Sequence, residues 1–354
     1  MPSVTPGSKI LVTGANGYIA LWVLRKLLEQ GYSVRAQVRS EAKGRHLKEY
    51  FKSYADKIEL IVVEDITKDG AFDEAVKRVA GIEHMASPLN LSTDDPDDYI
   101  VPAVQGTLSV LQSALKAGGS IKRIVVTSSL AAIFSTVADP PRTFTEADWG
   151  DEFVEAVKQK GKKSTGNEKY RASKTLAEQS AWDFYNKHKS EVGWDLVVVN
   201  PPLVIGPPLQ EVPTPAQLNA SLEAWFNIVF TEQSEGTLKA NYGYIHVEDI
   251  AQAHILALQK PEAGGERIII SAGNITWQST RNLLQKLYPE YYSSEILPAG
   301  NPGDTGDITA IYDGQKGKRI LGIEYKSIEE IAKDTITDFK ARGWLEKKYV
   351  PTTN

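Results

Sequence analysis

Residues 9–20 read Lys-Ile-Leu-Val-Thr-Gly-Ala-Asn-Gly-Tyr-Ile-Ala, and this stretch decides the fold. Its short apolar run is typical of a parallel strand that is covered on both faces. From Tyr18 to Gln30 apolar residues recur every three or four positions, which predicts an amphipathic helix. Gly14 and Gly17 lie between the two, where they allow a tight turn and a close approach of the backbone to a pyrophosphate. The stretch therefore predicts a strand, a glycine turn and a helix whose N-terminus binds an anion.

The same alternation of apolar runs and helical patterns continues to about residue 200. Further strands are expected at 33–38, 58–63, 81–86, 122–127 and 195–199, and helices near 42–54, 71–79, 99–117 and 168–187. Repeated strand–helix–strand units predict a parallel sheet with helices on both faces. The fold class is α/β, a doubly wound parallel Rossmann sheet with a smaller α+β substrate lobe.

The texture of the chain changes after residue 200. Prolines cluster between 201 and 215, a helical pattern covers 218–230, and a strand-then-helix pattern returns at 244–258. A length of 354 residues suits two domains. We expect a dinucleotide-binding Rossmann domain of residues 1–200 plus about 241–262, and a substrate-binding lobe of about 201–240 plus 263–354. The charged stretch 158–169 is expected to be a solvated loop.

Composition excludes several classes of function. With 40 basic and 45 acidic residues the net charge is -5, which argues against a nucleic-acid partner. Cysteine is absent, so disulfides, thiolate metal sites and cysteine nucleophiles are excluded, and the five histidines are scattered without a zinc motif. No metal is expected. The polar N-terminus and short apolar runs predict no membrane partner and a cytoplasmic location.

The end of the second strand selects the cofactor. NAD sites place an acid there, which would repel a 2′-phosphate. This chain has Val38-Arg39-Ser40 with Lys43 nearby, and both cations suit a phosphate, so the pattern favours NADPH. The alternative is that Arg39 lies on a solvated loop. Asp65, after the third strand, is a candidate for binding the adenine amino group, with an ordinary loop acid as the equal alternative.

Two further motifs carry candidate chemistry. Tyr170-Arg-Ala-Ser-Lys174 places a phenol and an ammonium one helical turn apart, and a nearby cation favours the ionised form of a phenol. The strand at 122–127 ends in Thr127-Ser-Ser129. Ligands of a doubly wound sheet bind at the carboxyl ends of strands, so a serine there can bond a carbonyl oxygen beside the tyrosine. The pattern itself does not choose between the two serines.

Together these motifs resemble the extended short-chain dehydrogenases/reductases, in the dihydroflavonol-4-reductase-like branch. The chain is similar to fungal NADPH-dependent aldehyde and ketone reductases of the methylglyoxal and isovaleraldehyde type. The resemblance covers nearly the whole chain and rests on these segments: TGANGYIA at 13–20, VRS at 38–40 with Lys43, HMASP at 84–88, VVTSS at 125–129, YRASK at 170–174, NPPLVIGP at 200–207 and YIHVEDIAQAHILAL at 244–258.

The resemblance implies a catalytic triad of Ser129, Tyr170 and Lys174. The residues that it and the patterns above assign to the cofactor are Gly14, Asn16, Gly17, Tyr18, Ile19, Arg39, Lys43, Asp65, Ile66, Ala86, Ser87, Pro88, Thr127, Tyr170, Lys174, Pro201 and Val204. Small residues and prolines also shape loops, so a purely structural role explains residues 86–88 and 201–204 nearly as well as a cofactor-binding role does. After Ser129 the chain continues Leu-Ala-Ala-Ile-Phe, where plant flavonoid reductases carry polar residues, which puts a flavonoid substrate in doubt.

Phe134, Trp225 and Phe226 are candidates for the wall of an apolar substrate pocket. The alternative for the aromatic residues of 218–230 is core packing, because they follow helical spacing. The expected function, which the resemblance implies, is NADPH-dependent reduction of an aldehyde or ketone to the alcohol by direct hydride transfer, with Tyr170 as the proton donor. A nucleotide-sugar epimerase or dehydratase and a non-catalytic NADP sensor are the alternatives. We expect a monomer or a homodimer.

Overall fold

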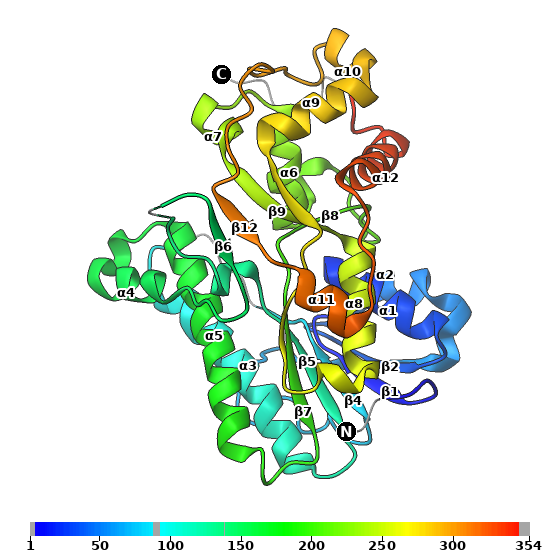
Figure 1. Cartoon of the computed structure of the whole chain (residues 1–354). Coiled ribbons are helices and arrows are strands. Elements are labelled where there is room, and N and C mark those ends of the chain that lie inside the picture. The colour runs from blue at the N-terminus through cyan, green and yellow to red at the C-terminus, as the bar shows by residue number, and fades with distance from the viewer. Residues whose placement is uncertain (1–3, 88–92, 138, 347–354) are drawn as a thin grey trace.

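The computed structural model of the chain describes residues 4–87, 93–137 and 139–346. Within these residues, seven parallel strands form a central sheet in the order β10-β7-β5-β4-β1-β2-β3 (Figure 1). They are β1 (Lys9–Val12), β2 (Ser33–Val38), β3 (Ile58–Val62), β4 (Gly81–His84), β5 (Arg123–Thr127), β7 (Asp195–Asn200) and β10 (Arg267–Ile269). The strand order reverses between β1 and β4, where doubly wound sheets bind their ligands. The predicted Rossmann fold is confirmed.

Helices cover both faces of this sheet. They are α1 (Tyr18–Glu29), α2 (Glu41–Tyr50), α3 (Asp97–Ala117), α5 (Gly166–His188), α8 (Val247–Gln259) and α11 (Gln315–Leu321). In Figure 1, α1, α2 and α8 lie on one side of the sheet, and α3 and α5 on the other. Ile10 and Val12 pack into the core under α1 and α8, whereas Leu11 packs into the core under α3 and α5. Because both faces are covered, the strands read as continuous apolar runs.

Residues 71–79, expected as a helix, form a series of turns. Phe72 and Val76 are buried at the spacing that suggested the helix. The buried guanidinium of Arg35 on β2 donates to the carbonyl oxygen of Ala75 at 2.8 Å. A side chain, rather than a helical N–H group, bonds that carbonyl. The regularly spaced apolar residues are therefore buried although the segment does not form a regular helix. The helix prediction is wrong here.

The described chain also contains two smaller sheets. One joins β8 (Leu203–Ile205), β9 (Asn241–His246) and β11 (Gly273–Thr276), and the other joins β6 (Arg142–Phe144) and β12 (Ala310–Tyr312). Around them lie α4 (Asp151–Lys160), α6 (Ala220–Phe230), α7 (Glu235–Lys239), α9 (Trp277–Leu287), α10 (Pro289–Ser293) and α12 (Ile328–Ala341). Short 3-10 helices lie at Lys52–Lys57, Leu130–Ala132, Gly161–Lys163, Pro215–Gln217 and Pro261–Ala263. In Figure 1 most of these elements lie above the central sheet, with α4 beside α5.

The strand pairing crosses the expected lobe boundaries. β10 lies beyond residue 262, in the segment that the sequence assigns to the smaller lobe, yet it pairs with β7 in the central sheet. β9 lies within 241–262 but pairs with β8 and β11. The helix that follows it, α8, packs against α1 on the central sheet. The expected boundaries thus do not coincide with the strand pairing at β9 and β10, and the division into two lobes stays a prediction.

Only a small part of the charged stretch 158–169 forms the expected loop. α4 continues to Lys160, and α5 begins at Gly166 after a capping box in which Thr165 and Glu168 exchange hydrogen bonds. Lys160 also pairs with Glu168 at 2.5 Å, so the two helices are joined at their ends. This fixes the start of the helix that carries the tyrosine and lysine.

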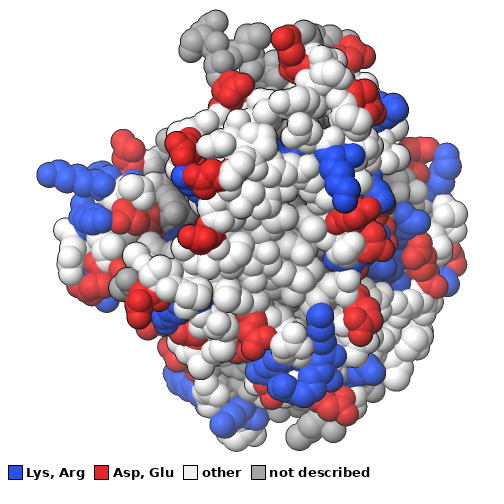
Figure 2. All heavy atoms as spheres, turned by 45° about the horizontal axis from the view of Figure 1, so that its top comes forward, with Lys and Arg blue, Asp and Glu red and all other residues white. Residues whose placement is uncertain are grey.

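Acidic and basic side chains are interspersed around a broad uncharged middle on the face that Figure 2 shows. In the part of the chain that the structure describes, every helix is too short or too polar to span a bilayer. The same residues contain no group of three or more histidines and acids that could hold a metal ion.

Candidate active site

The glycine turn holds the N-terminus of α1 close to the end of β4. Gly14 has a φ of +61°, and a Cβ atom there would lie 2.9 Å from Cα of Ala86. Only glycine fits both restrictions. Thr13 fixes this contact, since its Oγ1 accepts from the N–H groups of Met85 and Ala86 at 2.9 and 3.0 Å. The free N–H groups of α1 therefore form a cradle for an anion beside Ala86.

The other residues of the turn differ in exposure. Asn16, Gly17 and Ile19 are partly exposed, whereas Tyr18 is buried. The Tyr18 hydroxyl donates to the carbonyl oxygen of Gly206 at 2.8 Å, and burial raises the pKa of Tyr18 well above its ordinary value. This side chain joins α1 to the segment after β8, so Tyr18 can contribute to a cofactor site only through its backbone.

Arg39 and Lys43 lie at the carboxyl end of β2 and in the first turn of α2. The glycine turn is next to them, because the N–H group of Ala15 donates to the carbonyl oxygen of Gln37 at 2.9 Å. Both cationic side chains are exposed, and neither is paired with a carboxylate of the described chain. They are therefore available to a phosphate at the edge of the cradle.

Asp65 and Ile66 follow β3. Oδ1 of Asp65 accepts from the N–H and the hydroxyl of Thr67 at 2.9 and 2.6 Å, and these hydrogen bonds lower the pKa of Asp65. The carboxylate is thus ionised and held in one orientation. Ile66 packs against α3, where a Cβ atom on Gly106 would lie 2.8 Å from its Cδ1. Both positions are consistent with the edge of a nucleotide site.

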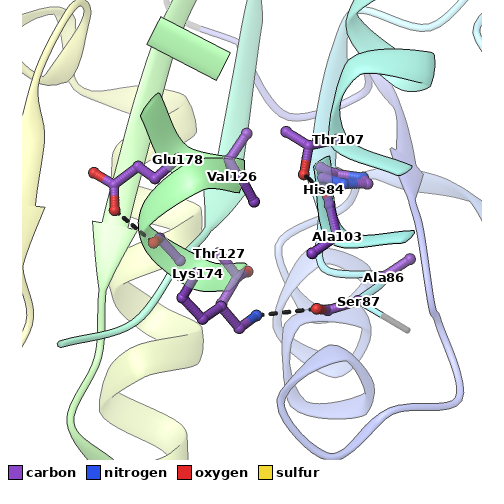
Figure 3. A pocket seen from close by; sticks show the side chains of 11 residues that line it. His84, Ala86, Ser87, Ala103, Thr107, Val126, Thr127, Lys174 and Glu178 are labelled. Carbon is purple, nitrogen blue, oxygen red and sulfur yellow. Dashed lines mark hydrogen bonds between the residues drawn. The ribbon is translucent and has the colours of Figure 1, made fainter. Parts of the chain in front are cut away.

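Lys174 of α5 reaches toward the end of β4. Its Nζ donates to Oγ of Ser87 at 3.0 Å across a small cavity that Ala86 and Thr127 also line (Figure 3). The ring centroid of Tyr170, one turn earlier, lies 5.9 Å from the same Nζ. The lysine thus connects the tyrosine with the segment that follows β4.

The two serines after β5 face different surroundings. Ser128 is buried and donates to Oε2 of Glu178 at 2.5 Å. Oγ of Ser129 accepts from the N–H of Ala131 at 3.1 Å, and Ser129 lines a second, larger cavity of about 730 Å³ together with Tyr170. The structure brings Ser129 and Tyr170 to one cavity, a choice that the strand pattern left open.

Glu178 is the centre of a buried network that the motifs did not indicate. Besides Ser128 it accepts from Nδ2 of Asn200 at 2.7 Å and from Nε of Arg267. Nδ2 of Asn200 also donates to the carbonyl oxygen of Ser129 at 3.2 Å. The sequence feature that could have indicated this network is an acid four residues after the lysine of YRASK, on the same face of the helix. The network holds the side chain of Ser128 and the backbone carbonyl of Ser129.

A second buried pair lies behind Thr127. Oγ1 of Thr127 is 3.2 Å from Nε2 of His254, whose Nδ1 lies 2.6 Å from Oε2 of Glu83. Burial raises the pKa of Glu83. The Thr127 hydroxyl is therefore held by a histidine from α8, although the residue also lines the small cavity.

Of the three aromatic candidates for the pocket wall, the structure brings only Phe134 to the large cavity. Trp225 and Phe226 are 1% and 2% exposed and pack in the core with Phe230 and Phe339. α6 instead presents its small residues to the cavity: Ala220, Ser221 and Ala224. The core-packing alternative holds for Trp225 and Phe226, because one helix face is covered by other helices and the opposite face borders the cavity.

Pro201 and Val204 are buried, and Val204 packs into the core from β8. Their neighbours Pro202 and Leu203 line the large cavity. Pro88, the remaining residue assigned to the cofactor, lies outside the described residues.

The model of the NAD dependent epimerase/dehydratase family matches residues 10–273. The chain belongs to this family. The matched residues include the glycine turn, and also both serines and the YRASK helix, which contribute to the lining of the two cavities.

Several fungal proteins are similar to this chain over nearly its whole length. Ketoreductase azaE of Aspergillus niger is 33% identical over 336 residues, which are 93% of this chain and 96% of the relative. The NADPH-dependent methylglyoxal reductase GRE2 of Saccharomyces cerevisiae is 33% identical over 92% of this chain and 96% of its own. The crystal structure of yeast methylglyoxal/isovaleraldehyde reductase Gre2 with NADPH superimposes with a TM-score of 0.84, at 31% identity, over 95% of this chain and 99% of that one. The resemblance to extended short-chain dehydrogenases/reductases is confirmed.

Proposed function

We propose that the protein reduces an aldehyde or ketone to the alcohol with NADPH, and that Tyr170 is the proton donor. One observation carries the proposal. Ser129 and Tyr170 line the large cavity, and Lys174, which lies on α5 with Tyr170, extends to Ser87 in the small cavity. Two hydroxyls and a cation thus surround the place where a carbonyl group would meet the cofactor.

The residues present fit NADPH. Gly14 lets the turn lie against Ala86, where a Cβ atom would clash, and the N-terminus of α1 that this turn positions suits a pyrophosphate. Arg39 and Lys43 have no carboxylate partner among the described residues and lie where NAD sites carry an acid, so they suit the 2′-phosphate. The NADPH in the crystal structure of the yeast relative supports the same choice of cofactor.

Each member of the triad then has a definite task. NADPH, when bound, supplies the hydride for the carbonyl carbon. Ser129 donates a hydrogen bond that orients the carbonyl oxygen, and Tyr170 gives its proton to that oxygen as negative charge develops there. The ammonium of Lys174, one turn away, lies 5.9 Å from the ring centroid of Tyr170, so its positive charge is close to the oxygens at which negative charge develops during the reaction.

The test follows NADPH absorbance with a panel of small aldehydes and ketones. We expect turnover by the wild type and a fall in kcat/KM of about 10²- to 10⁴-fold in Tyr170→Phe, with NADPH binding retained, because only a proton donor is removed. Tyr185→Phe is the matched control, since Tyr185 lies on the same helix but packs against Trp194. If the wild type consumed no NADPH with any carbonyl, an epimerase, a dehydratase or an NADP sensor would be favoured instead.

A cytoplasmic location, the absence of nucleic-acid and membrane partners, and a monomeric or homodimeric state stay predictions.

A further inference from the structure

The large cavity has an unusual distribution of charge. Among the described residues that line it, the only charged side chain is Arg171, and there is no aspartate or glutamate. The other polar groups are neutral hydroxyls and amides, such as Ser129, Asn219 and Tyr312, set among apolar and aromatic side chains. A ligand in this cavity therefore meets one full positive charge and no negative one from the described chain.

Arg171 is held firmly, but not by a counter-ion. Its Nε donates to Oδ1 of Asn167 at 3.2 Å, and its guanidinium carbon lies 4.1 Å from the ring centroid of Phe134 and 4.9 Å from that of Phe153. Its Nη1 is buried and has no hydrogen-bond partner in the described chain. The aromatic rings thus fix the orientation of the guanidinium while its hydrogen-bonding capacity stays partly unused.

The nearby acid does not neutralise this arginine. Oε1 of Glu152 accepts from the N–H and the hydroxyl of Thr136 at 2.7 and 2.5 Å, and it forms no ion pair with Arg171. Burial lowers the pKa of Arg171, yet a guanidinium stays protonated in proteins. A partly buried cation without a counter-ion is unfavourable, and a ligand that brings a negative charge would relieve this.

We propose that Arg171 binds a carboxylate of the substrate, so that the preferred substrates are oxo acids, in which an aldehyde or ketone and a carboxylate share one short carbon skeleton. This rests on the proposed carbonyl reduction and names its substrate class. A guanidinium matches a carboxylate through two parallel hydrogen bonds. A single cation also balances the one negative charge of a carboxylate better than the double charge of a phosphate, and the apolar walls suit a carbon skeleton.

The reaction leaves the carboxylate unchanged. The carbonyl carbon gains a hydride from NADPH, which becomes NADP⁺, and the carbonyl oxygen gains the proton of Tyr170, so the oxo acid becomes a hydroxy acid. Tyr170 then recovers its proton from water. Tyr170 and Arg171 are consecutive on α5 and line the same cavity, so one helix turn can hold both ends of a short substrate.

The test compares straight-chain oxo acids of four to seven carbons, each with a terminal aldehyde, with their methyl esters. We expect the wild type to show a kcat/KM at least tenfold higher for one or more acids than for the matched ester, chiefly through a lower KM. In Arg171→Met this acid-to-ester ratio should fall at least tenfold, and Arg171→Lys should retain part of it because the charge remains.

The control is Arg142→Met. Arg142 is a cation that also stacks on an aromatic ring, that of Phe144, but it pairs with Asp148 and does not line the cavity. Its acid-to-ester ratio should equal that of the wild type. Equal use of acid and ester by the wild type, or an equal loss for both in Arg171→Met, would overturn the oxo acid proposal while neutral aldehydes are still reduced. Failure to reduce acids, esters and neutral aldehydes alike would instead overturn the proposed function and this inference with it.

Discussion

Ser128 and Ser129 are identical side chains on consecutive residues, and their surroundings separate them. Ser128 donates to a buried carboxylate, and Ser129 borders the cavity that holds Tyr170. A hydroxyl that already donates to Glu178 cannot donate to a substrate carbonyl at the same time. The environment of each residue, rather than its type, therefore decides which serine is available.

Arg39 provides a prediction about the cofactor at the scale of one residue. Arg39→Ser should raise the KM for NADPH about 10- to 100-fold and leave the KM for NADH nearly unchanged, because the charge-assisted bonds go to the phosphate that NADH lacks. Arg45→Ser is the control, since Arg45 is also exposed on α2 but lies beyond its first turn. Steady-state kinetics with both cofactors measures the effect, and an equal loss with NADPH and NADH would contradict the phosphate role.

At the scale of elements, α5 carries most of the site. Tyr170, Lys174 and Glu178 recur every four residues, so they form one stripe along the helix. The stripe runs from the large cavity past the small one into the core, where Glu178 meets partners from β7 and β10. A single helix thus links the candidate proton donor with the buried network under the central sheet.

Glu178→Gln should lower the free energy of unfolding by about 3–5 kcal/mol, because the buried Arg267 loses its counter-ion. Glu155→Gln on α4 is the matched control, since Glu155 pairs only weakly with Lys158 at the surface, and we expect a change below about 0.5 kcal/mol. Urea denaturation of the two variants beside the wild type makes the comparison. Similar small losses in both would show that the buried pair does not stabilise the fold.

The elements that the sequence predicted wrongly have a common cause. Residues 71–79 carry a helical apolar spacing, but Arg35 from a distant strand bonds a carbonyl there. The stretch 158–169 is polar, yet Lys160 and Glu168 join two helices across it. In both cases contacts between separate segments outweigh the local sequence pattern. β1, α1 and α5 form as their sequence patterns predict, because there the local pattern and the contacts with other segments favour the same structure.

For the whole molecule, buried histidines predict how stability depends on pH. Burial and the charge of Lys174 lower the pKa of His84 to about 3, and burial lowers the pKa of His246 to about 4. Both are neutral in the folded chain but take up a proton when unfolded below pH ~6.5. Their contribution to stability is therefore complete above that pH and is lost as the pH falls. Asp249, whose pKa burial raises to about 6, acts in the opposite direction.

Between pH 7.5 and pH 5, His84 and His246 should each cost about 2 kcal/mol. Asp249 and Glu83, whose pKa values burial raises, should return part of this, so the free energy of unfolding should fall. His84→Gln should remove about 2 kcal/mol of that fall, since glutamine can still accept from Thr13 but does not titrate. Urea denaturation at the two pH values measures both quantities. A wild type equally stable at both would contradict the assigned protonation states.

The sequence by itself determined the doubly wound sheet, the glycine turn at its first strand and the tyrosine–lysine pair on one helix. These depend on local spacing, on backbone restrictions at a glycine, and on residues one helical turn apart. Only the tertiary structure decided that Ser129 borders the cavity, that Trp225 lies in the core, and that Arg171 is the one charge lining the large cavity in the described chain. Each of these depends on which distant segments cover a side chain, and burial and charge pairing are properties of the packed chain rather than of any stretch of it.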